Sequence, residues 1–159
     1  MDYLKVMGGC QRKREMKNKL YCNKKIDFFY HNDSHKHEVI SVDYIEKGEV
    51  IEEAAVMLDS TDSDDLKEKI FKWPKGYDNP ICDVFVQGFG SFFRRSNSKD
   101  ISNINWECDL KNNIIIFTAI KDIDSGEFLT LYDNDYKPPS SDQVKKNIRT
   151  FLDKMRDDI

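Results

Sequence analysis

Two adjacent arginines followed by a serine (Arg94, Arg95 and Ser96) are the residues of this 159-residue sequence with the clearest capacity for chemistry. Guanidinium groups bind phosphate and carboxylate groups through paired N–H donors. The triplet therefore indicates a site for a phosphate group or an acidic peptide. From the sequence alone, a solvent-exposed pair of loop arginines is an equally good interpretation.

Three histidines close together (His31, His35 and His37) form a second group. His35 and His37 would share one face of a strand, which is an arrangement able to hold a metal ion. A zinc site of the knuckle type needs paired cysteines within a turn, and the four cysteines are widely spaced (Cys10, Cys22, Cys82 and Cys108). The sequence therefore predicts no metal site, and four free thiols in a reducing compartment.

Positive charge is concentrated in the first 26 residues, which hold eight basic and two acidic side chains. Their net charge is +6, and since the whole chain carries −4, the remainder carries −10. Residues 1–25 are thus expected to form a basic N-terminal extension that could contact nucleic acid, an acidic partner or an import receptor. The alternative is a solvated extension that touches only its own acidic domain.

The composition is that of one globular domain, with 39% hydrophobic and 34% charged residues. No apolar run approaches the roughly 20 residues that cross a bilayer, and no hydrophobic stretch follows the first residue as in a signal peptide. We therefore expect an intracellular protein, nuclear or cytoplasmic and not secreted, without a membrane partner.

Short strands are predicted along most of the chain, bounded by turn residues. They are expected at 26–30, 39–42, 45–52 with a continuation to 57, 82–86, near Phe92, 114–119 and 128–132. Helical spacing of Leu66 and Ile70 predicts one helix over 62–72, which Pro74 and Gly76 end.

A second helix is predicted near the end of the chain. Ser140 and Gln143 form a capping box after two prolines. An apolar stripe at helical spacing follows (Val144, Ile148, Phe151, Leu152 and Met155). Residues 138–159 are therefore expected to form an amphipathic helix that packs on a domain spanning residues 26–137.

The order of motifs between residues 26 and 136 resembles the SET domain, the fold of S-adenosylmethionine-dependent protein-lysine methyltransferases. The matching positions are Ile45, 48–52, Phe93, Ser96, Asn103, Trp106, Ala119, Ile123, 126–127 and 129–130. The compact size and the run Gly88-Phe89-Gly90 look most like the small viral-type members. The resemblance implies a mainly β fold with peripheral helices, of the β-clip type, with a C-terminal pseudoknot.

The resemblance also implies a cofactor, a substrate and a site. S-adenosylmethionine would be the cofactor, and a lysine of a protein or peptide would accept the methyl group. The cofactor would lie between Lys36, His37 and Glu38 on one loop and Arg94, Arg95 and Ser96 on another. A tyrosine, Tyr132 or Tyr136, would orient the lysine amine.

The sequence departs from the family pattern at each of these places. Lys36, His37 and Glu38 stand where the family has a glycine-rich loop, and Arg94-Arg95 stands where it has Asn-His. The family tyrosine lies seven residues after the turn glycine, whereas Tyr132 lies six residues after Gly126; a one-residue shift on a strand reverses the direction of a side chain.

Two functional hypotheses follow. The first is a SET-domain protein related to protein-lysine N-methyltransferases, with altered cofactor and tyrosine motifs. The alternative is a catalytically degenerate SET module that binds a protein or is associated with chromatin or nucleic acid.

Overall fold

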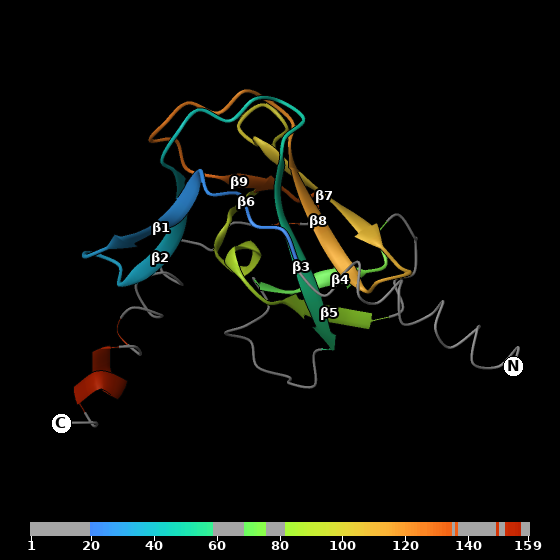
Figure 1. Cartoon of the computed structure of the whole chain (residues 1–159). Helices are drawn as coiled ribbons and strands as arrows, with labels where there is room; N and C mark the ends of the chain where they lie inside the picture. Colours follow the sequence, from blue (N-terminus) through green and yellow to red (C-terminus); the bar gives the residue numbers. More distant parts are fainter. Residues whose placement is uncertain are drawn as a thin grey trace, which may run out of the picture.

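The computed structural model describes residues 20–58, 69–75, 82–134, 136, 149 and 152–156, and a little under half of these residues form short strands (Figure 1). A seven-stranded sheet has the order β4-β5-β3-β8-β7-β9-β6, and β1 and β2 form a separate hairpin. The strands are β1 (Ile26–His31), β2 (Lys36–Ser41), β3 (Val50–Leu58), β4 (Phe71–Trp73), β5 (Cys82–Val86), β6 (Arg94–Ser96), β7 (Ile104–Asp109), β8 (Ile114–Ala119) and β9 (Thr130–Tyr132); η2 (Phe89–Phe92) is a 3-10 helix. The predicted mainly β architecture is confirmed.

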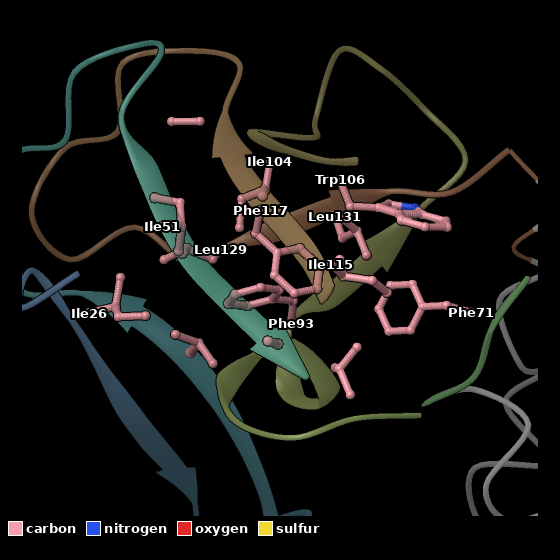
Figure 2. Packing of buried hydrophobic residues seen from close by; sticks show 14 of the residues in the cluster. Ile26, Ile51, Phe71, Phe93, Ile104, Trp106, Ile115, Phe117, Leu129 and Leu131 are labelled. Carbon is pink, nitrogen blue, oxygen red and sulfur yellow. The ribbon is translucent and has the colours of Figure 1, made fainter. Parts of the chain in front are cut away.

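The centre of the large sheet is formed by β3, β8 and β7, which pair antiparallel. Their buried side chains meet aromatic residues from the neighbouring segments. Phe117 of β8 packs edge-on against Phe93, with ring centroids 5.0 Å apart, and against Phe71. Figure 2 shows Phe93, Phe117 and Leu131 gathered beside β3 and β8.

The β1–β2 hairpin is joined to the large sheet by hydrogen bonds to the segment before β9. Leu129 N donates to Val39 O at 2.9 Å, and Ser41 N donates to Glu127 O at 2.8 Å. Ile40 and Phe128 form an isolated β-bridge between the same two segments. The hairpin is thereby fixed beside the end of the sheet that holds β6 and β9 (Figure 1).

Strand β9 lies between β6 and β7, although β6 and β7 are consecutive strands in the chain. It runs parallel to both of them. Main-chain hydrogen bonds join it to the two flanking segments, from Arg94 N to Leu129 O (3.0 Å) and from Asn103 N to Thr130 O (3.0 Å). A segment late in the chain is thus inserted between two strands that are consecutive in the chain.

The run Gly88-Phe89-Gly90 positions the loop that leads into β6. Gly88 has φ +114°, and a Cβ there would lie 2.6 Å from a carboxylate oxygen of Glu52. A Cβ on Gly90 would lie 2.5 Å from the Phe117 ring. Glycine is therefore required at both positions by close packing, and at the first also by its backbone conformation.

Three details differ from the predicted elements. Phe71–Trp73 is a strand paired with β5, so the helix predicted over 62–72 is wrong at its end, because pairing with β5 overrides local helical spacing; residues 62–68 lie outside the described part. A 3-10 helix occupies the position near Phe92 where a strand is predicted. Strand β7 is not predicted, because Asn105, Glu107 and Asp109 are poor strand formers.

Several predictions concern the ends of the chain. Residues 1–19 of the basic extension lie outside the described residues, as does most of the predicted C-terminal stripe. Residues 152–156 are helical, with Leu152 37% and Met155 50% exposed. Within the described ranges, no helix is long and apolar enough to cross a membrane.

Candidate functional site

A cavity of about 270 Å³ opens to solvent where three distant parts of the chain meet. One part is the end of the β1–β2 turn with the start of β2, the second is the segment from η2 into β6, and the third is Tyr136 after β9. Lys69, just before β4, closes a further side. The lining residues are His35, Lys36, His37, Lys69, Ser91, Phe92, Phe93, Arg94, Arg95 and Tyr136.

Five of the eight predicted site residues line this cavity: Lys36, His37, Arg94, Arg95 and Tyr136. The other three lie outside it. Glu38 and Ser96 are buried. Tyr132 lies on β9 opposite Ser96 and is only partly buried.

Glu38 is an ion-pair partner of Arg94. Its carboxylate accepts hydrogen bonds from Nε and Nη2 of Arg94, and the second of these bonds is 3.2 Å long. Nε2 of His31 lies 2.6 Å from the same carboxylate. The guanidinium of Arg94 also lies over the Phe128 ring, 3.7 Å from its centroid. The arginine is thus held on one side by a nearly buried carboxylate and on another by an aromatic face.

Arg95 is held in a similar way by other groups. Its Nη1 donates to Ile70 O at 2.7 Å and lies 3.5 Å from a carboxylate oxygen of Asp133. The guanidinium is 4.3 Å from the centroid of the Phe71 ring, and only 8% of the side chain is exposed. Both arginines therefore lie on strand β6 with a carboxylate beside them; Arg95 is nearly buried, whereas Arg94 remains 41% exposed.

An aromatic cluster continues from the cavity along one face of the hairpin. His37 lies 4.9 Å from Tyr30, 5.9 Å from Phe28 and 6.4 Å from Phe92, measured between ring centroids. Phe28 stacks on Phe89 at 4.4 Å. Phe28 and Tyr30 remain more than 40% exposed. Rings that are both ordered and accessible can stack against a planar ligand.

The two candidate tyrosines have different surroundings. Tyr136 lines the cavity, and its main chain is fixed by a bond from Nδ2 of Asn97 to Tyr136 O (3.2 Å) and by one from Tyr136 N to Asp133 O (3.1 Å). The Tyr132 hydroxyl donates to Oδ1 of Asn134 at 3.3 Å. Of the two, Tyr136 is the one beside the cavity.

The buried carboxylate of Glu52 supports the loop that supplies much of the lining. It accepts hydrogen bonds from Phe89 N at 2.9 Å and Gly90 N at 3.0 Å, at the start of η2. Burial raises the pKa of Glu52 from its ordinary value, although the two backbone donors oppose this shift. The carboxylate satisfies backbone donors that η2 cannot satisfy itself.

Five lining residues were not among the predicted site residues: His35, Lys69, Ser91, Phe92 and Phe93. Ser91 and Phe92 lie just before the Arg94-Arg95 pair, so proximity in sequence was an available signal. Lys69 gave no such signal, because it is 25 residues before Arg94 in the chain. In the described part of the chain, no group of three or more His, Cys, Asp or Glu side chains is arranged to hold a metal ion.

Comparisons with known proteins identify the fold. No protein-family model matches the sequence, and no curated protein matches it either. Among solved structures, a candidate histone methyltransferase of Plasmodium falciparum is similar at 21% identity and a TM-score of 0.53, over 72% of this chain and 97% of that one.

Two further solved structures have the same similarity in fold. The SET domain of ATXR5, bound to a methylated histone H3, matches at 14% identity and a TM-score of 0.54, over 89% of this chain and 70% of that one. A chain of polycomb repressive complex 2 from Chaetomium thermophilum matches at 17% identity and a TM-score of 0.53, over 76% of this chain and 16% of that one. At these identities the similarity shows the fold, which is that of the SET domain.

Proposed function

We propose that this SET-fold chain transfers a methyl group from S-adenosylmethionine to the side-chain amine of a protein lysine. One observation carries the proposal: the three segments that the resemblance assigns to the cofactor and the tyrosine surround a single cavity. The substitutions at Lys36, Arg94 and Arg95 line that cavity and leave it open.

The electrostatics of the lining are compatible with this cofactor. An uncompensated guanidinium beside a sulfonium would be repelled by it. Arg94 is paired with Glu38 and Arg95 lies beside Asp133, so each positive charge has a carboxylate next to it. Phe92 and Phe93 supply apolar surface for the uncharged part of the cofactor, and Lys36 or Lys69 would bind its carboxylate.

The chain's own residues would prepare the acceptor lysine. When bound, S-adenosylmethionine supplies a methyl group activated by the neighbouring sulfonium. The acceptor amine must be neutral to attack, and enclosure beside a cation lowers the pKa of an amine. The hydroxyl of Tyr136 would accept a hydrogen bond from the amine and hold it in line, and such positioning supplies much of the rate.

A protein substrate is supported by the solved structures of similar fold. The ATXR5 SET domain has been crystallised in complex with histone H3, so a domain of this fold can bind a protein. We therefore propose a lysine-containing protein as the substrate of this chain.

The second candidate is a SET module that binds a partner without transferring a methyl group. It is favoured by Lys36 and Glu38, which stand where the resemblance expects glycines, and by the Tyr132 hydroxyl, which is bonded to Asn134. Side chains at glycine positions restrict the approach of a cofactor to the backbone.

Titration of S-adenosylmethionine into the full chain by calorimetry tests the first step. We expect saturable binding with a dissociation constant in the micromolar range, followed by methyl transfer to a lysine-containing protein, detected by mass spectrometry. Absence of binding at millimolar cofactor together with absence of transfer would reject the methyltransferase and favour the second candidate. Binding without transfer to any protein tested would support a cofactor-binding module only.

A further inference from the structure

We infer that the cavity and the aromatic cluster beside it form a binding site for a nucleoside phosphate. The cluster is defined as Phe28, Tyr30, His37 and Phe92. This inference goes beyond the proposed function and does not depend on methyl transfer.

The two lysines of the lining favour an anion. Lys36 and Lys69 line the cavity beside Arg94 and Arg95; each arginine already has a carboxylate partner, and the described lining residues themselves include no carboxylate. Phosphate oxygens form short, strong hydrogen bonds with such groups. The carboxylates of Glu38 and Asp133 lie outside the lining, where they hold the two arginines.

The arginines are positioned before any ligand arrives. Arg94 is fixed by Glu38 and the Phe128 ring, yet its side chain remains 41% exposed at the cavity. A donor that is already held loses little conformational entropy when a ligand binds. The ion pairs therefore hold the two guanidinium groups in position at the cavity.

The aromatic cluster adds a second requirement for the ligand. His37 and Phe92 line the cavity, and Phe28 and Tyr30 extend the ring surface along the hairpin. Stacking of a base on an aromatic side chain contributes about 1–3 kcal/mol. An acidic peptide or free phosphate would engage only the cations, whereas a nucleoside phosphate engages the cations and the rings together.

Calorimetric titration of ADP, adenosine and pyrophosphate into the full chain, without S-adenosylmethionine, tests this inference. We expect ADP to bind about tenfold or more tightly than adenosine, because adenosine has no phosphate for the cations. No binding of ADP at millimolar concentration, or equal binding of ADP and adenosine, would overturn the inference.

Two matched pairs of variants separate the cavity from general charge and hydrophobicity. Lys36→Gln should raise the dissociation constant for ADP by about five- to tenfold. Lys111→Gln removes the same charge at an exposed position away from the cavity, and should change this constant by less than about twofold. Equal effects would indicate general electrostatic attraction and reject the site.

The second pair uses neighbouring rings of equal exposure on the two faces of the hairpin, Phe28 and Phe29. Phe28→Leu should lower the affinity for ADP by about fivefold and leave the affinity for pyrophosphate unchanged, whereas Phe29→Leu should change neither affinity. Equal effects of the two substitutions on ADP would reject the stacking surface. If ADP binds as described and S-adenosylmethionine does not, the proposed function fails and this inference stands.

Discussion

Glu38 and Arg94 form an ion pair that joins two positions 56 residues apart in the chain. Both positions depart from the pattern that the SET-domain resemblance implies, one in a glycine-rich loop and the other in an Asn-His pair. In the folded chain the two departures are partners, and each accounts for the other: the carboxylate balances the guanidinium, and the guanidinium satisfies a carboxylate that is only 7% exposed.

Removal of the negative charge at this pair should destabilise the fold. Glu38→Gln leaves the Arg94 guanidinium opposite a neutral amide, so we expect the free energy of unfolding in urea to fall by about 2 kcal/mol. The double variant Glu38→Gln/Arg94→Gln should recover part of this loss. As a control, Asp83→Asn breaks the exposed pair with Lys72 and should cost less than about 1 kcal/mol. Equal losses in the two single variants would contradict a special role for the Glu38 pair.

Glu52 should make stability depend on pH in a defined direction. Burial raises the pKa of Glu52 in the folded chain above the ordinary value of 4.5. Between 4.5 and the raised value the folded chain binds more protons than the unfolded chain, so the free energy of unfolding falls as pH rises through that window.

Urea denaturation over a pH series compares the wild-type chain with Glu52→Gln, which cannot ionise. The stability of the wild type relative to Glu52→Gln should decrease as pH rises above about 4.5 and become constant above the folded-state pKa. A difference that does not change with pH would show that Glu52 titrates alike in both states.

Gly90 should not tolerate even a methyl group. Gly90→Ala places a Cβ 2.5 Å from the Phe117 ring in the centre of the core, and such overpacking costs about 1–3 kcal/mol. Gly126→Ala is the control, since it meets nothing within 4 Å and has only the strain of φ +91°, about 1 kcal/mol. Thermal unfolding of the two variants measures both costs. A smaller loss for Gly90→Ala than for Gly126→Ala would mean that the core around Phe117 adapts.

The two tyrosines should differ in their effect on catalysis. Tyr136→Phe removes the hydroxyl of a residue that lines the cavity and should lower kcat for methyl transfer by about 100-fold or more, since positioning of the amine is lost. Tyr132→Phe removes a hydroxyl bonded to Asn134 and should change kcat by less than about threefold. Neither substitution should change the affinity for S-adenosylmethionine by more than about threefold. A larger fall for Tyr132→Phe would assign the catalytic role to Tyr132.

Local composition was sufficient to predict the strands that are rich in β-branched and aromatic residues. The predicted strand 114–119 has the observed bounds of β8, and 82–86 those of β5, because both are rich in β-branched or aromatic residues. Phe71 and Lys72 fall within the helix predicted over 62–72, because local spacing cannot report the pairing of Phe71–Trp73 with β5.

The sequence was sufficient to predict which segments contribute to the candidate site, but not which side chains contact one another there. Lys36, His37, Arg94, Arg95 and Tyr136 were named from the resemblance, and they line one cavity. The partners of the arginines, Glu38 and Asp133, lie 56 and 38 residues away, so nothing in the local sequence indicated that the charges would be balanced.

The insertion of β9 between β6 and β7 makes the assembly of the cavity depend on pairing between distant segments of the chain. Strand β9, which leads to Tyr136, pairs with β6 from 36 residues earlier (Arg94 with Thr130) and with β7 from 27 residues earlier (Ile104 with Leu131). Contacts between segments so far apart in the chain make folding slow. A ligand that contacts the hairpin, β6 and Tyr136 would bind only the folded arrangement of these segments, and would therefore raise the free energy of unfolding.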